Sequence, residues 1–112
     1  IFGASLASSL GCGFVPIRKP GKLPYKTYSQ DYSLEYGTDI MEIHTDAIES
    51  KDNILLLDDV LATGGTACAA LKLLQKFKCK IIECLFLLEI SSLKGSEKIV
   101  SQNKKYFSLI KY

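Results

Sequence analysis

Hydrophobic residues recur with two different periods in the second half of the chain. Residues 54–57 form a continuous aliphatic run, which predicts a strand buried on both faces. From Thr66 the apolar positions follow helical spacing, and the polar residues take the opposite face. Residues 80–90 return to a run rich in Ile, Leu and Phe, which predicts the next strand. Strand, helix and strand in this order predict a right-handed βαβ unit with a parallel sheet. The apolar face of the predicted helix comprises Ala67, Ala70, Leu71, Leu74 and Phe77.

Shorter elements are predicted elsewhere. A helix is expected over residues 4–10, with Gly11 at its C-terminal cap. A turn is expected at 37–39. Residues 18–26 contain two prolines, one glycine and four cations, which predicts a mobile loop. Residues 91–105 are polar. Short apolar segments predict the remaining strands, at 1–3, 12–17, 33–36, 40–45 and 107–112. No repeat or linker interrupts this pattern, so we expect a single α/β domain over residues 1–112.

Composition and charge narrow the class of protein. A chain of 112 residues, 47% hydrophobic, fits one globular domain. The 14 basic and 12 acidic residues are too balanced for a general nucleic-acid binder. No stretch is long and apolar enough to span a bilayer, and no signal-peptide pattern occurs, so no membrane partner is expected. Four cysteines without Cys-x-x-Cys spacing, and a single histidine, argue against a zinc site and favour a reduced, cytosolic protein.

The start of the chain is unusual. The sequence begins at Ile1, and its only methionine is Met41. We therefore expect that a further segment precedes residue 1 in the complete protein.

The junction between the strand at 54–57 and the following helix carries the candidate chemistry. Asp58 and Asp59 follow the strand directly, at the carboxyl edge where parallel sheets bind ligands. Two glycines then allow close approach of a ligand, and the helix start offers unpaired N–H groups to a phosphate. Carboxylates are natural partners of vicinal hydroxyls. The junction therefore predicts a ribose 5-phosphate site. Its phosphate-binding segment comprises Ala62, Thr63, Gly64, Gly65 and Thr66.

Two other interpretations explain parts of this junction. An aliphatic run followed by aspartate is equally typical of a metal-binding aspartate in nucleotide hydrolases. However, no Gly-x-x-x-x-Gly-Lys-[Ser/Thr] segment occurs, so a P-loop protein would lack its main phosphate cradle. The other interpretation is an acidic turn before a helix start without function. The intact combination of strand, carboxylates and glycines argues against it.

The run from Ile54 to Thr66 resembles the phosphoribosyl diphosphate (PRPP) motif of type I phosphoribosyltransferases. Three further segments, 17–24, 32–37 and 92–98, are similar to the adenine phosphoribosyltransferases within that family. The resemblance covers almost all of the chain in the family's order. It implies an α/β fold with a central, mainly parallel sheet flanked by helices. It also implies that the N-terminal strand and the hood over the base lie outside this chain.

The resemblance implies a reaction of adenine with PRPP that gives AMP and pyrophosphate, in a cytosolic homodimer, with Mg²⁺ held mainly through PRPP rather than by the protein directly. By position, Asp58 and Asp59 would hold the ribose hydroxyls, and residues 62–66 the 5-phosphate. Glu35 matches the family's candidate for proton transfer with adenine, and is a catalytic candidate together with the two aspartates. The remaining matches are base-proximal positions and a pyrophosphate loop, namely Tyr36, Val60 and Ile90, and Arg18, Lys19 and Lys22.

Several alternatives stay open. The loop cations are also consistent with an exposed basic surface, Glu35 with a solvent-facing strand residue, and Tyr36 with a hydrophobic layer. For the whole chain, the alternative is a non-catalytic PRPP-binding fragment or regulatory isoform. In the family, the hood and an arginine-containing pyrophosphate loop come from the segment before residue 1. A transferase for another base is a third hypothesis, and the 32–37 segment argues against it.

Overall fold

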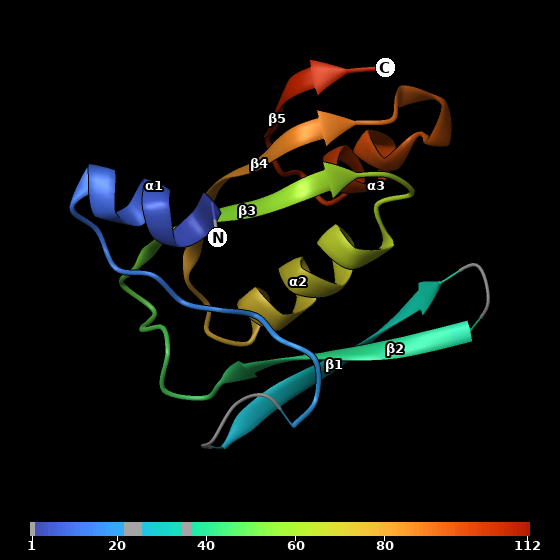
Figure 1. Cartoon of the computed structure of the whole chain (residues 1–112). Coiled ribbons are helices and arrows are strands. Elements are labelled where there is room, and N and C mark those ends of the chain that lie inside the picture. Colours follow the sequence, from blue (N-terminus) through green and yellow to red (C-terminus); the bar gives the residue numbers. More distant parts are fainter. Residues whose placement is uncertain (1, 22–25, 35–36) are drawn as a thin grey trace.

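The computed structural model describes residues 2–21, 26–34 and 37–112. Within them the chain forms a two-stranded antiparallel sheet, β1-β2, and a three-stranded parallel sheet with the order β3-β4-β5 (Figure 1). The elements in chain order are α1 (Phe2–Leu10), β1 (Thr27–Leu34), β2 (Gly37–His44), β3 (Asn53–Leu61), α2 (Gly65–Gln75), β4 (Lys80–Glu89), the 3-10 helix η1 (Ser91–Leu93), α3 (Gly95–Ser101) and β5 (Tyr106–Lys111).

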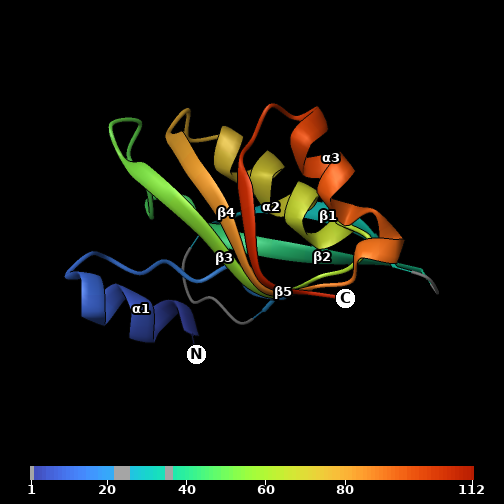
Figure 2. The ribbon, with the colours of Figure 1, turned by 90° about the horizontal axis from the view of Figure 1, so that it is seen from above.

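The predicted parallel βαβ unit is confirmed as β3-α2-β4. β3 and β4 pair in parallel, with Leu56 opposite Cys84 and Asp58 opposite Phe86. β5 adds to the far side of β4, also in parallel. Helices lie on both faces of this sheet, with α1 on one side and α2 and α3 on the other (Figure 2). The expected α/β architecture, a parallel sheet flanked by helices, is therefore confirmed.

Helix α2 lies between the two sheets and contributes to two hydrophobic clusters. Leu73 and Leu74 pack with Met41 and Ile43 of the hairpin β1-β2. On the side of the parallel sheet, Leu71 joins a second cluster, which also contains Leu61, Ala67, Cys84, Phe86 and Ile99. The predicted apolar face of α2 is thus confirmed, but burial extends beyond it to Ala69 and Leu73 because the hairpin covers a second side. The exposed residues of α2 are Thr66 at its start and Lys72 and Gln75 further along, followed by Lys76 at the C-cap.

Three predictions near the N-terminus and the hairpin are wrong. Phe2 and Gly3 belong to α1 rather than to a strand. Residues 12–17 form no strand, because a strand needs a partner for its N–H and C=O groups and only the adjacent Arg18 pairs, with Glu42. Residues 37–39 form the start of β2 rather than a turn, since Gly37 pairs with Leu34. β1 also begins at Thr27, six residues earlier than the predicted strand at 33–36.

The predicted burial of residues 54–57 on both faces is also wrong. Leu55 is 45% exposed, because β3 is an edge strand of the described sheet and α1 covers its second face only in part. β3 continues to Leu61, so Asp58 and Asp59 lie within the strand and not after it. The polar stretch 91–105 contains η1 and α3, which the sequence pattern did not predict. The last strand is confirmed as β5.

All four cysteines carry free thiols. Among the residues that the structure describes, none of the helices combines the length and the apolar character that crossing a membrane requires.

Candidate functional site

The two acidic residues of the predicted site, Asp58 and Asp59, follow each other near the carboxyl end of β3. The Asp59 backbone N–H donates a hydrogen bond of 2.8 Å to Oδ1 of Asp58. The strand ends two residues later, at Leu61, and the chain turns through residues 62–64 into α2. Gly64 has φ of 88°, a left-handed conformation that favours glycine. The carboxylates and the helix start are therefore neighbours at the edge where parallel sheets bind ligands.

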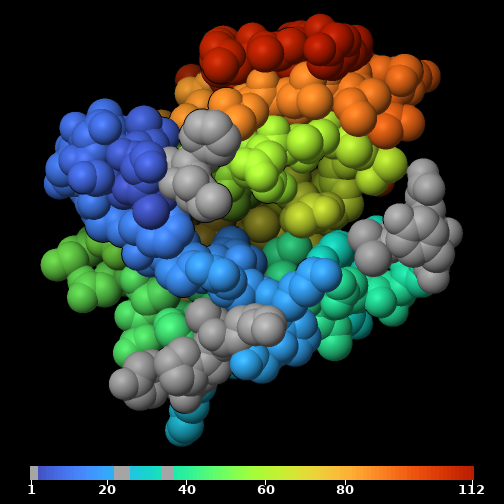
Figure 3. All heavy atoms as spheres, viewed as in Figure 1, coloured from blue at the N-terminus to red at the C-terminus, as the bar shows by residue number. Residues whose placement is uncertain are grey.

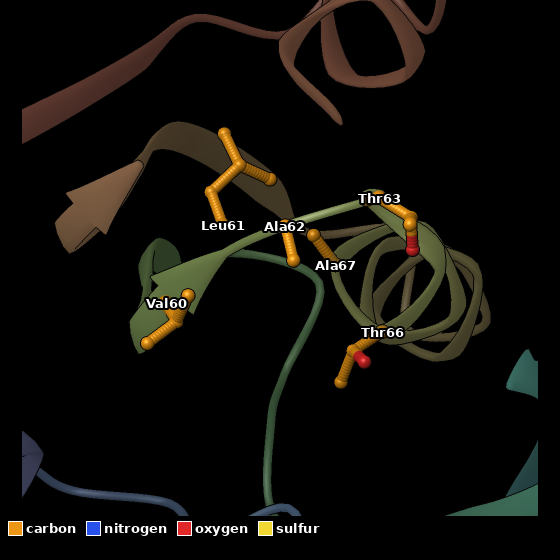
Figure 4. Close-up of a pocket in the computed structure, with 7 residues that line it drawn as sticks. Val60, Leu61, Ala62, Thr63, Thr66 and Ala67 are labelled. Carbon is orange, nitrogen blue, oxygen red and sulfur yellow. The ribbon is translucent and has the colours of Figure 1, made fainter. Parts of the chain in front are cut away.

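The start of α2 and the end of β3 enclose a small pocket of about 50 Å³ (Figure 4). No side-chain hydrogen bond caps the helix at Gly64 within the described part of the chain. The N–H groups of the first helical turn have no partner within the helix, and the helix dipole favours an anion at this end. Thr63 and Thr66 are exposed and add two hydroxyl donors. That this pocket binds a phosphate group stays a prediction. The pocket is lined by Val60, Leu61, Ala62, Thr63, Gly64, Thr66 and Ala67.

Residues 18–26, which precede β1, are called the basic segment here. A larger hollow of about 1120 Å³ connects the site with the start of this segment. Arg18 and Lys19 line the same hollow as Asp58, Asp59 and Thr66. In Figure 3 the N-terminal segment, in blue, crosses this face of the molecule between the parallel sheet and the hairpin. The structure therefore brings two of the three predicted loop cations to the space in front of the two carboxylates.

The basic segment is fastened to β2 by Glu42, which the sequence analysis did not identify. The backbones of Arg18 and Glu42 exchange two hydrogen bonds, of 2.9 and 2.6 Å. The Glu42 carboxylate accepts further bonds from the Gly21 N–H, at 3.1 Å, and from the Thr27 hydroxyl, at 2.9 Å. Lys19 reaches Asp39 of the same strand, with 3.6 Å between Nζ and Oδ2. Both ends of the basic segment are thus fixed relative to β2.

The structure describes only some of the other predicted site residues. Val60 is 43% exposed and lines the small pocket. Ile90 is half-buried beside it, since its N–H donates to the Leu61 carbonyl at 2.9 Å. Val60 and Ile90 therefore lie at neighbouring strand ends, and their contact with the base stays a prediction. Three predicted residues, namely Glu35, Tyr36 and Lys22, lie outside the described residues.

The environment of the Asp58 carboxyl disfavours its ionised form. Loss of solvent raises its pKa above the ordinary value of 3.8, and the charge of Asp59 adds to the rise, while the hydrogen bond from the Asp59 N–H opposes it. A carboxyl whose pKa is raised on folding makes the folded state less stable at any pH where it is ionised. That cost disappears below pH 3.8, where the group is protonated in both states.

We therefore expect Asp58→Asn to raise the free energy of unfolding at pH 7. The gain should be about 0.5 kcal/mol or less, because solvent screens the exposed part of the carboxyl. Asparagine keeps an oxygen for the Asp59 N–H. Urea unfolding at pH 7 and pH 3 measures the effect, with the exposed Asp46→Asn as a matched control. The gain should vanish at pH 3, and a variant less stable than the parent at pH 7 would contradict the inferred cost of ionising Asp58.

The fold and the site together define a class of protein. The chain is an α/β protein whose parallel sheet carries, at one carboxyl edge, two carboxylates beside a glycine-containing helix start. The chain matches the phosphoribosyl transferase domain family over residues 1–111, and it belongs to that family.

Similar proteins agree with this assignment. Over all 112 residues the chain is 54% identical to an adenine phosphoribosyltransferase of Psychromonas ingrahamii, of which it covers 62%. Among solved structures, the adenine phosphoribosyltransferase of Thermoanaerobacter pseudethanolicus has a TM-score of 0.93 and 48% identity, with 99% of this chain and 63% of that chain covered. The Saccharomyces cerevisiae enzyme, complexed with an imino-altritol bisphosphate and adenine, has a TM-score of 0.90 and 42% identity, with 96% and 60% covered. The chain thus spans less than two thirds of each relative.

Proposed function

We propose that the chain carries the PRPP-binding and catalytic part of an adenine phosphoribosyltransferase, which converts adenine and PRPP to AMP and pyrophosphate in purine salvage. The observation that carries the proposal is the meeting of three features around one hollow. These are the carboxylates of Asp58 and Asp59, the phosphate pocket at the start of α2, and the cations Arg18 and Lys19. They match the diol, the 5-phosphate and the pyrophosphate of PRPP, respectively. The adenine bound to the yeast relative supports the choice of base.

Each group has a chemical role in the proposed reaction. The pocket over residues 62–66 holds the 5-phosphate and so fixes the ribose. As the bond from C1 to pyrophosphate breaks, positive charge develops on the ribose, and the carboxylates of Asp58 and Asp59 stabilise it. Arg18 and Lys19 face the anionic leaving group, together with Lys22. Glu35 exchanges the proton of adenine, and Tyr36, Val60 and Ile90 contact the base. These roles rest on the family resemblance as well as on position.

The carboxylate oxygens at the site are suitable ligands for Mg²⁺. This ion prefers oxygen ligands and is commonly held through one or two carboxylates plus the phosphates of a substrate. Asp58 and Asp59 supply carboxylate oxygens next to the phosphate pocket. We propose that Mg²⁺ enters mainly through PRPP, where it neutralises charge on the departing pyrophosphate. The resemblance also supports a cytosolic homodimer, and the balanced charge of +2 supports small-molecule substrates rather than nucleic acid.

The second candidate is a PRPP-binding piece without turnover. The observation in its favour is that the chain spans 62% of the Psychromonas relative, so 38% of that enzyme has no counterpart here. A cradle for ribose phosphate binds PRPP without completing the reaction if groups that close over the base come from elsewhere.

Two measurements on this chain separate the candidates. Calorimetric titration with PRPP and Mg²⁺ should show binding under both. An assay of AMP formation from adenine and PRPP should show turnover only if the 112 residues are catalytically sufficient, and we expect turnover well below that of a full-length relative assayed in parallel. Competition among adenine, guanine, hypoxanthine and orotate identifies the base. Failure to bind PRPP would overturn both candidates, and preference for another base would overturn the adenine assignment.

A further inference from the structure

The start of α3 contacts the segment that lines the phosphate pocket. After β4 the chain passes through η1, whose neighbour Lys94 has a left-handed conformation with φ of 57°. This turn brings Gly95, the first residue of α3, against residues 61–64. Gly64 and Gly95 are both buried. Gly95 belongs to the segment 92–98, which the proposed reaction leaves without a role.

The contact is backbone against backbone and has no room for a methyl group on either side. A Cβ placed on Gly95 would lie 2.9 Å from the Gly64 nitrogen and 3.0 Å from Cδ1 of Leu61, and closer still to the Ala62 carbonyl oxygen. A Cβ placed on Gly64 would lie 2.8 Å from the Gly95 carbonyl oxygen and 3.1 Å from its Cα. Distances below 3.0 Å are essentially never found for real Cβ atoms. This backbone contact therefore requires glycine at both position 64 and position 95.

The structure also indicates which side would move if a methyl group were introduced at Gly95. Most of the obstacles are main-chain atoms, so no side-chain rotation relieves the clash. α3 is held by Ile99, which is fully buried in the same cluster as Leu61 and Leu71. The segment 62–64 has no regular secondary structure and lies between the end of β3 and the start of α2. A displacement would therefore fall on the phosphate-binding segment.

We propose that Gly95 is a positioning residue for the phosphate-binding segment. By lacking a side chain, it lets the start of α3 support residues 62–64 directly, so that the N–H groups at the start of α2 converge on one point. The inference rests on the proposed function in its claim about phosphate. Its claim about the segment's conformation stands on the contact alone.

Gly95→Ala tests both claims, with Gly13→Ala as the matched control. Gly13 has no atoms within 4 Å of an added Cβ and no positive φ, so it reports the effect of the same substitution without the contact. In the ligand-free chain, Gly95→Ala should speed amide hydrogen exchange at Cys68 by about tenfold or more. The Cys68 N–H donates a hydrogen bond of 2.9 Å to the Gly64 carbonyl, and displacement of the segment breaks that bond. Exchange at Leu71 to Leu74 should not change.

The second readout is the affinity for ribose 5-phosphate, measured by calorimetry. It should fall about 10- to 100-fold in Gly95→Ala, the effect of one or two misaligned hydrogen bonds to a charged group. It should be unchanged in Gly13→Ala. Unaltered exchange at Cys68 overturns the inference, and so does faster exchange spread evenly over α2, which would show general destabilisation. A parent chain that binds no ribose 5-phosphate overturns the proposed function, while the exchange data still decide the role of Gly95.

A third measurement needs no variant, in case Gly95→Ala does not fold. Ribose 5-phosphate bound to the unaltered chain should slow amide exchange at Gly95 and Ser96 as well as in the phosphate-binding segment, because the two backbones are in contact. Protection confined to residues 62–66 would contradict a supporting role for Gly95.

Discussion

Replacing Asp59 with Asn should lower the rate of AMP formation by about 100- to 1000-fold, the range found when one preorganised electrostatic group is removed from an active site. The substitution removes the negative charge that we propose to stabilise the ribose, and it keeps the shape of the side chain. It also keeps the hydrogen bond to Asp58, because that bond comes from the Asp59 backbone N–H. We therefore expect a large loss of turnover with the fold preserved.

The Asp59→Asn experiment needs two controls. Asp46→Asn removes the same charge from an exposed position between β2 and β3 and should leave the rate unchanged. Urea unfolding should place the free energy of unfolding of Asp59→Asn within about 0.5 kcal/mol of the parent, as for other exposed substitutions. If the parent chain turns over too slowly to assay, PRPP affinity replaces the rate as the readout. Full activity, or undiminished PRPP affinity in that case, would remove the role assigned to Asp59.

Replacing Leu71 with Ala should cost about 2–5 kcal/mol of folding free energy, the usual range for truncating a buried leucine. Leu71 is fully buried on the side of α2 that faces the parallel sheet. Its cluster includes Leu61 and Ala67, which also line the phosphate pocket. The cavity would thus open directly beneath the candidate site. Since small domains have only about 5–15 kcal/mol in total, this variant should be close to unfolding at physiological temperature.

Lys72→Ala provides the neighbouring control for Leu71→Ala. Lys72 is the next residue of α2 and is exposed, so the substitution should change the free energy of unfolding by about 0.5 kcal/mol or less. Thermal and urea unfolding followed by circular dichroism measure both variants. A Leu71→Ala midpoint close to that of Lys72→Ala would show that the second cluster contributes little, contrary to its burial.

The sequence predicted those helices and strands whose hydrophobic residues follow one clear spacing. The apolar positions of α2 and the aliphatic runs of β3 and β4 identified the βαβ unit, and with it the junction that holds Asp58 and Asp59. These features are local in the sequence, so they could be found without knowing the partners. The left-handed Gly64 belongs to the same group, because glycine at the start of a helix after a strand is itself a signal.

The predictions that failed depend on distant partners. Residues 12–17 have the composition of a strand, but only the neighbouring Arg18 pairs with β2, so no strand forms. Residues 29–31 are polar, yet they belong to β1 because β2 pairs with them along the whole hairpin. The roles of Glu42 and Gly95 were missed for the same reason. Each acts on a segment more than 20 residues away, through contacts that no local pattern encodes.

The position of α2 between two sheets has a consequence for cooperativity. One side of the helix supplies the core under the parallel sheet, and another supplies the core under the hairpin. Neither sheet can lose its packing without exposing a face of the helix, so the two halves should open as one unit rather than as independent foldons. An anion that binds at the start of α2 would then stabilise both halves together, because ligand binding to the folded state shifts the whole unfolding equilibrium by mass action.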